Sequence, residues 1–163
     1  MNCQVSASPS MITWAGKHWF FYMGYNTRHG SWSMETSPAV GLAVLPQDRL
    51  AGLHVQSGAT EGLLTTAPFE VSQTKLLINA AIPAGSQLQI LVMTSGANCT
   101  EHTNCLVSGF GMIDTRMRML PDQMWYHCNW SGGELGTFIR KTIQLRIRLF
   151  GDTRLYAFRM TNT

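Results

Sequence analysis

The chain has 163 residues, enough for one domain with a substantial core and too few for two ordinary domains. Hydrophobic residues make up 45% and charged residues 13% of the sequence, a balance that excludes a largely disordered chain. The net charge of +3 is too mild to indicate nucleic-acid binding, and no apolar run reaches the roughly 18 residues of a membrane helix. We therefore expect neither nucleic acid nor a membrane as a partner.

The first half of the chain predicts short strands separated by polar turns. Residues 18–25 are aromatic and typical of a strand, and residues 39–45 place valine and leucine at alternate positions. A polar loop, residues 26–38, separates the two. Residues 50–55 and 62–66 predict further short strands.

The second half alternates apolar and polar residues more sharply. Residues 75–82 and 87–93 flank a Pro-Ala-Gly turn and predict a β-hairpin. Residues 142–149 form the clearest strand, and residues 154–160 form the last one. The intervening segments are less regular: 110–124 follows no period, 126–130 predicts a strand, and 134–139 predicts a helical turn or a loop.

Regular short strands with turn signals, no strong helix and no internal repeat together predict an all-β fold. The expected architecture is an antiparallel β-sandwich of the jelly-roll or lectin-like type.

Four cysteines are compatible with two disulfides in a small β protein. Cys99 and Cys105 flank a short polar loop, and we predict a disulfide between them. A zinc site formed by Cys99, His102 and Cys105 is the alternative, although it lacks an obvious fourth ligand nearby. Cys3 and Cys128 can be free or paired.

Asn98-Cys-Thr and Asn129-Trp-Ser match the N-glycosylation pattern. Beside a predicted disulfide, these two sites favour a secreted, extracellular protein. The N-terminus has no signal peptide. We therefore expect that Met1 is not the natural start, either because the chain is the tail of a longer protein or because the start was assigned wrongly.

Half of all lysines and arginines lie close to the C-terminus. They are Arg140, Lys141, Arg146, Arg148, Arg154 and Arg159. A solvated outer face of a sheet is the simple interpretation. The alternative is a face for an acidic glycan, with Arg146 and Arg148 as its candidate residues.

Several short motifs together resemble one protein family. They are Gly62-Leu-Leu-Thr-Thr-Ala-Pro-Phe69, Leu76-Leu-Ile-Asn79, Gln87-Leu-Gln-Ile90, Ser108-Gly-Phe110, Trp130, Lys141-Thr-Ile-Gln-Leu-Arg-Ile147 and Arg154-Leu-Tyr-Ala-Phe158. Their order is similar to the C-terminal β-sandwich of uncharacterised proteins related to the five-bladed β-propeller glycosidases (the β-fructosidase and arabinanase-like superfamily). Upstream, residues 20–25 and 39–44 resemble the last strands of the propeller.

The resemblance implies two parts: residues 1–55 with remnant strands of a propeller blade, and residues 56–163 as the β-sandwich. In the family, the catalytic carboxylates come from earlier blades, which this chain lacks. The resemblance therefore implies an accessory, non-catalytic module that is associated with carbohydrate.

Aromatic side chains that accompany polar ones are the candidate sugar-binding residues, because rings stack on the apolar face of a sugar. Trp125 precedes a predicted strand and is one candidate platform, whereas Trp130 matches a structural tryptophan of the family and is expected in the core. Tyr25, Arg28, His29 and Trp32 form a second candidate cluster, for which a plain surface loop is the alternative.

The sequence presents no pair of carboxylates in a suggestive motif, no nucleophile elbow and no phosphate loop. We therefore expect no catalytic residue, no cofactor and no metal. The leading hypothesis is a glycan-binding or glycan-associated module from a secreted glycosidase-like protein. The alternatives are a structural or adhesion domain that self-associates through exposed blade strands, as a homo-oligomer, and, third, a glycoside hydrolase.

Overall fold

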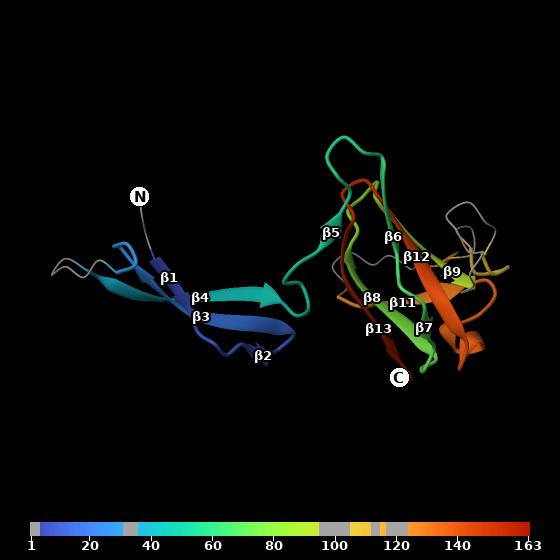
Figure 1. The fold of residues 1–163 in the computed structure, drawn as a ribbon, viewed down its shortest axis with the longest axis horizontal. Coiled ribbons are helices and arrows are strands. Elements are labelled where there is room, and N and C mark those ends of the chain that lie inside the picture. Colours follow the sequence, from blue (N-terminus) through green and yellow to red (C-terminus); the bar gives the residue numbers. More distant parts are fainter. Residues whose placement is uncertain (1–3, 31–35, 95–104, 112–114, 117–123) are drawn as a thin grey trace. The chain divides into compact units, whose positions relative to one another are not determined.

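The computed structural model describes residues 4–30, 36–94, 105–111, 115–116 and 124–163. Every described element is a strand except one 3-10 helix, Leu135–Phe138, so this part of the chain is all-β, as predicted (Figure 1). No helix within it is long and apolar enough to span a membrane.

The chain forms two compact units, Met1–Leu50 and Ala51–Thr163, which we call the N-terminal unit and the C-terminal unit. The family resemblance implied a division between residues 55 and 56. Leu53 and His54 pair with the last strand of the chain, so they belong to the C-terminal unit.

The N-terminal unit is one antiparallel sheet around a central strand. β3 (Lys17–Tyr25) pairs along its whole length with β4 (Pro38–Pro46). On the other side of β3, β2 (Ile12–Trp14) pairs near its start and β1 (Gln4–Ala7) near its end. The two strands expected over residues 18–25 and 39–45 are thus present and adjacent.

The N-terminal unit has almost no buried interior. Among its described residues, His18 is the only buried side chain. It accepts a hydrogen bond of 2.9 Å from the Asp48 N–H at Nε2, so Nδ1 carries the proton that it shares with the Thr13 hydroxyl, 2.9 Å away. These contacts tie the turn after β4 to the β2–β3 hairpin.

The C-terminal unit contains two antiparallel sheets. In one, β12 (Thr142–Phe150) is central, with β9 (Gln87–Thr94) on one side. On its other side lie β6 (Glu61–Thr65) and then β7 (Phe69–Glu70). The second sheet has the order β10–β11–β8–β13–β5, with the bounds Thr115–Arg116, Tyr126–Trp130, Lys75–Ala81, Arg154–Thr161 and Leu53–His54.

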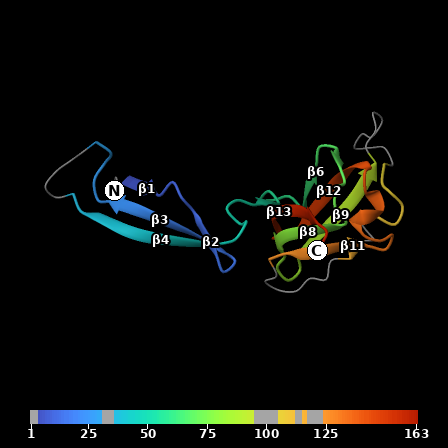
Figure 2. The same ribbon diagram turned by 90° about the horizontal axis from the view of Figure 1, so that it is seen from below.

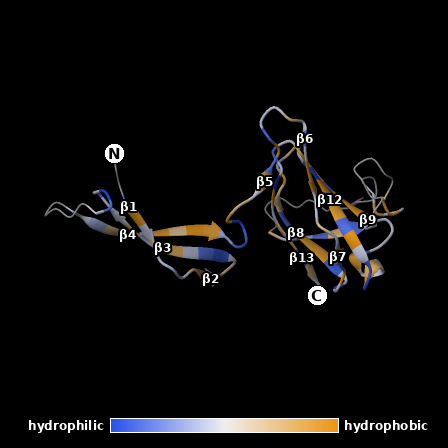
Figure 3. Ribbon diagram, in the orientation of Figure 1, coloured by the Kyte–Doolittle hydropathy of each residue, from blue (hydrophilic) through white to orange (hydrophobic). Residues whose placement is uncertain are grey.

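The two sheets of the C-terminal unit share one hydrophobic core, which is consistent with a β-sandwich (Figure 2). Leu76 and Ile78 on β8 enter this core from one sheet, and Ile90 on β9 enters it from the other. The alternation predicted for residues 142–149 is confirmed, since every second side chain of β12 is buried. Figure 3 shows this alternation as bands of orange and blue along β12.

The predicted hairpin over residues 75–93 is wrong, although both of its strands are present. β8 pairs with β11 and β13, whereas β9 pairs with β12, so the turn at residues 82–86 carries the chain from one sheet to the other. Both strands alternate, and an alternating strand can bury its apolar side in either arrangement. The pattern therefore could not decide which sheet each strand joins.

Candidate functional site

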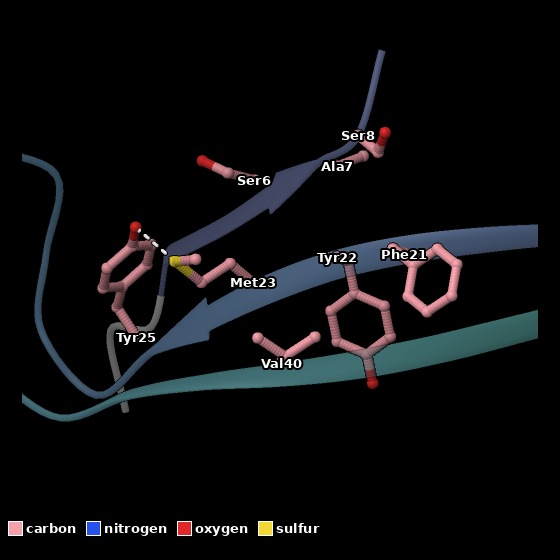
Figure 4. A pocket seen from close by; sticks show the side chains of 8 residues that line it. All are labelled: Ser6, Ala7, Ser8, Phe21, Tyr22, Met23, Tyr25 and Val40. Carbon is pink, nitrogen blue, oxygen red and sulfur yellow. Dashed lines mark hydrogen bonds between the residues drawn. The ribbon is translucent and has the colours of Figure 1, made fainter. Parts of the chain in front are cut away.

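Two hollows in the N-terminal unit share Tyr25. The first, which we call the apolar hollow, has a volume of about 320 Å³. Its walls are mainly apolar and aromatic, and two serines add hydroxyl groups. The lining residues are Ser6, Ala7, Ser8, Phe21, Tyr22, Met23, Tyr25 and Val40 (Figure 4).

The second hollow, the polar hollow, has a volume of about 170 Å³. Its lining supplies a guanidinium, an imidazole, an amide and hydroxyl groups in addition to the ring of Tyr25. The lining residues are Gln4, Tyr25, Thr27, Arg28, His29, Gly30 and Thr36. Three of the four residues predicted as a cluster, Tyr25, Arg28 and His29, therefore line one hollow, while Trp32 lies outside the described residues.

Tyr25 stands at the junction of the hollows because it is the last residue of the central strand. Its cross-strand neighbours are Gln4 on β1 and Pro38 on β4. Its hydroxyl donates a hydrogen bond of 2.7 Å to the sulfur of Met23 (Figure 4). The ring of Tyr25 lines both the apolar and the polar hollow.

The loop after β3 is tied back to β4. The Asn26 side-chain oxygen accepts a hydrogen bond of 2.8 Å from the Ser37 N–H. Gly30 has φ +80, a left-handed conformation that glycine adopts without strain. Residues 27–30 of this loop line the polar hollow.

The floor of the apolar hollow depends on a small residue in β4. The Tyr22 ring lies over Gly41, its cross-strand neighbour. A Cβ atom at position 41 would lie 2.2 Å from Cζ of Tyr22, so any side chain there would displace the ring. Gly41 therefore allows an aromatic ring to lie flat against the sheet.

The two hollows combine aromatic rings with polar side chains. Rings that can stack on a sugar adjoin side chains that can hydrogen-bond its hydroxyl groups. Glycoside hydrolysis needs two facing carboxylates. Among the residues that the structure describes, none that lines either hollow is Asp or Glu. Within the same described ranges, no group of His, Cys, Asp and Glu could hold a metal ion.

Trp125 and Trp130 have different surroundings. Trp130 is buried, packs against Phe110 at a centroid distance of 5.5 Å, and donates a hydrogen bond of 2.8 Å to the Ile90 carbonyl. Its expected place in the core is confirmed. Trp125 is half-buried, and the Arg159 guanidinium lies 4.2 Å from its ring centroid. One face of Trp125 is therefore occupied by a cation, which leaves a single face for any ligand.

Arg146 and Arg148 lie on the side of β12 that faces away from the core, and both are half-buried. Arg148 forms an ion pair with Glu61, and its guanidinium lies 5.1 Å from the Phe150 ring centroid. Arg146 has a buried Nε without a hydrogen-bond partner. The charge of Arg148 is thus already balanced, which weakens the case for an acidic-ligand face at these two residues.

Only some of the residues in the cysteine and glycosylation predictions lie in the part of the chain that the structure describes. Asn98, Cys99, His102 and Cys3 lie outside the described residues, so the Cys99–Cys105 disulfide, the zinc alternative and the Asn98 glycan stay predictions. Asn129 lies on β11 with its side-chain oxygen buried. Cys128 is a free thiol in the core, and burial raises its pKa far above the ordinary value.

Cys128 has no imidazole partner on its own face of β11. His127 points to the opposite side of the strand, where its Nε2 lies 3.9 Å from Oε1 of Glu134. Successive residues of a strand point to opposite faces, which explains these directions. The thiol therefore has no neighbouring base on the strand that could activate it as a nucleophile.

Several lining residues of the hollows were not predicted from the sequence. Gln4 and Ser6 come from the edge strand β1, Ser8 directly follows that strand, and Thr36 comes from the far end of the loop. Only the register that places Gln4 opposite Tyr25 brings them to the site. A run of alternating small and polar residues at positions 4–8 carries no signal of that pairing.

Comparisons of the chain with protein-family models, with curated proteins and with solved structures find no match.

Proposed function

We propose that the chain is a non-catalytic glycan-binding module and that the sugar lies across Tyr25, between the apolar and polar hollows. The observation that carries the proposal is that one ring, that of Tyr25, borders both hollows. A pyranose or furanose ring needs this pairing of a stacking surface with polar groups. Arg28 and His29 line the polar hollow and add groups that can hydrogen-bond a sugar.

We also keep the family assignment as part of this proposal. In that assignment the N-terminal unit is the remnant of a propeller blade, the C-terminal unit is a jelly-roll sandwich, and the whole is the C-terminal part of a secreted, glycosylated, glycosidase-like protein. A propeller blade is covered by a neighbour on both faces, so its strands are apolar on both sides. The exposed apolar residues on β3 and β4 support this origin.

Binding to an array of neutral, uronic-acid and sulfated oligosaccharides tests the proposal. Titration calorimetry with the best ligand then compares wild type with Tyr25→Ala, which should weaken binding at least about tenfold because the stacking surface is lost. Trp14→Ala is the matched control, since Trp14 is an exposed aromatic residue outside both hollows. Equal losses in the two variants, or no binding to any glycan, would contradict the proposal.

Self-association is the second candidate function, and one observation favours it. The N-terminal unit exposes large apolar side chains along β3 and β4, among them Phe21, Val40 and Leu42. Sedimentation velocity on wild type and on Leu42→Lys would reveal it, because a lysine inside an apolar interface should dissociate the oligomer. A monomer at all concentrations rules this candidate out.

A glycoside hydrolase is the least supported candidate. It would need a pair of carboxylates beside the sugar, and the described lining of the hollows offers none.

A further inference from the structure

One side of the C-terminal unit leaves a strand edge open. β13 (Arg154–Thr161) pairs with β8 along one side, whereas on its other side β5 pairs only with Arg154 and Leu155. In the part of the chain that the structure describes, no strand pairs with Ala157–Thr161 on that side. An edge strand directs the N–H and C=O groups of alternate residues outward, ready to pair with another strand.

The core is also uncovered beside this edge. Phe158 lies opposite Ile78 and Met160 lies opposite Leu76, so both side chains are on the core-facing side of the sheet. Ile78 and Leu76 are completely buried, yet Phe158 is 40% exposed. A core-facing phenylalanine with this exposure indicates that the layer lacks a strand beyond β13.

The opposite wall comes from the other sheet. Leu64 on β6 and Phe69 on β7 lie opposite Ile147 and Ile143 of β12, which places them on the core-facing side too. Both are only partly buried and pack against the core from its open side. The two sheets therefore leave a groove between β13 and the β6–β7 segment.

The groove has two parts, each with a volume of about 430 Å³. One lies near Leu53, Leu64 and Leu155, and the other near Phe69, Glu70 and Met160. Phe158 lines both, so the parts meet at that residue. The groove runs along β13 from the end of β5 to Met160, and apolar atoms form most of its wall.

We propose that this groove binds an extended peptide segment of a partner protein, which adds to the sheet as a strand antiparallel to β13. The backbone of the peptide would pair with Ala157–Thr161 in line with β5, which already occupies the first two positions of the same edge. Its alternate apolar side chains would enter the groove on either side of Phe158. Their repeat of roughly 6.6 Å matches the spacing from Phe158 to Met160 along β13.

An extended peptide fits this place better than an apolar small molecule. A small molecule would fill the apolar wall and leave the outward N–H and C=O groups of β13 without partners, whereas a strand satisfies both. The groove belongs to the C-terminal unit and shares no lining residue with the hollows around Tyr25, so this inference stands apart from the proposed glycan site.

A model peptide tests the proposal on the full chain. The probe is a nine-residue peptide with valine at alternating positions, threonine between them and lysine at each end. Amide chemical shifts of the isotope-labelled protein are followed during titration. The expected result is saturable binding that shifts the amide signals of Ala157–Thr161 and Leu64, with unchanged signals on β4 of the N-terminal unit.

Two matched changes separate backbone pairing from apolar contact. A peptide that is N-methylated at alternate amides keeps every side chain but loses the backbone N–H groups that would pair with β13. It should bind at least about tenfold more weakly than the original peptide. In the protein, Phe158→Ala should weaken binding of the original peptide by a similar factor. Leu63→Ala is the control, because Leu63 is exposed on the face of β6 that points away from the core.

The outcomes are decisive in either direction. Equal binding of the N-methylated peptide, or shifts confined to β4, would overturn the proposal. A dimer of the chain that Phe158→Ala abolishes would also overturn it, because the occupant would then be a second copy. If the Phe158→Ala variant does not fold, the comparison of the original with the N-methylated peptide still tests the proposal, because that comparison uses the wild-type protein.

Discussion

β4 and β12 are two nine-residue strands with similar sequence patterns and opposite surroundings. β4 (Pro38–Pro46) and β12 (Thr142–Phe150) both place valine, leucine or isoleucine at every second position. On β12 these side chains are buried, and Leu145 is completely so, whereas on β4 Leu42 is 44% exposed. The comparison teaches that alternation determines a strand, while burial requires a second layer, which within the described residues the C-terminal unit has and the N-terminal unit does not.

The difference between the units also locates the two proposed activities. The C-terminal unit has a core that stabilises it, and its groove is the place where core-facing side chains such as Phe158 are exposed. The N-terminal unit has hollows at the end of a single sheet, where side chains reach out from loop and strand alike. We therefore expect mutations to affect folding mainly in the C-terminal unit and glycan binding mainly in the N-terminal unit.

The largest effect should be seen in the reactivity of Cys128. Burial excludes alkylating reagents and raises the pKa of this thiol, so it reacts only when the unit unfolds. At pH 8 we expect alkylation of Cys128 at least about a thousandfold slower in the folded chain than in urea. Peptide mass spectrometry measures it, and rapid labelling of the folded chain would show that the core of the C-terminal unit is open.

The same thiol predicts a pH dependence of stability. In the unfolded chain its pKa has the ordinary value of 9.0, and in the folded chain it is raised. The contribution of this thiol to the free energy of unfolding is therefore fully present below pH 9. It falls as the pH rises above 9, because only the thiol of the unfolded chain ionises. Urea unfolding at pH 8 and pH 10 should show a larger decrease for wild type than for Cys128→Ala; equal decreases would contradict the assignment.

A pair of leucine substitutions tests the comparison of β12 with β4 directly. Leu145→Ala should lower the free energy of unfolding by about 2–5 kcal/mol, because it leaves a cavity in a completely buried site. Leu42→Ala should change it by less than about 1 kcal/mol, since its side chain is already exposed. Urea denaturation followed by tryptophan fluorescence measures both, and similar losses would place β4 in a core.

A pair of glycine substitutions should give a smaller difference. A Cβ atom at Gly132 would lie 2.5 Å from the Phe110 ring and 3.0 Å from the Gly109 carbonyl oxygen, so Gly132→Ala should cost about 1–3 kcal/mol. A Cβ atom at Gly24, on β3, meets nothing within 4 Å, and Gly24→Ala should be nearly neutral. Thermal unfolding compares the two variants; a neutral Gly132→Ala would mean that Phe110 packs more loosely than its burial indicates.

The smallest effect should come from the ion pair of Arg148 with Glu61. Both side chains are partly exposed, so Glu61→Gln should cost less than about 0.5 kcal/mol, and the cost should shrink further in 1 M salt. Urea denaturation at two salt concentrations measures it. A decrease of more than about 1 kcal/mol in the free energy of unfolding would show that this ion pair stabilises the fold more than an exposed pair does.

Much of the fold was predictable because its strands have a local signature. The strands around residues 18–25, 39–45 and 142–149 were predicted from aromatic content or alternation, which depend only on neighbours in sequence. The partners of β8 and β9 were not, because two alternating strands separated by a short turn can lie in one sheet or in two. That choice depends on long-range packing, which no local pattern contains.

In the candidate site, the residues that lie close together in the sequence were predictable, and those brought in by strand pairing were not. Tyr25, Arg28 and His29 lie within five residues, so a single loop brings them together. Gln4 reaches the polar hollow only through its register with Tyr25. The groove beside Phe158 depends on an absent neighbour, since the described part of the chain pairs only the first two residues on the outer edge of β13. No feature of residues 154–161 alone indicates that gap.

Native-state hydrogen exchange of the full chain is the measurement that tests the contrast between the two units most directly. Our account predicts that amides of β12 exchange only through global unfolding, because both neighbours and a core protect them. Amides of β3 that pair with β4 should exchange through local opening at a clearly lower free energy, since the described residues of the N-terminal unit form a single sheet in which only His18 is buried. Equal protection of β3 and β12 would contradict the account, because the N-terminal unit would then share the stability of a core.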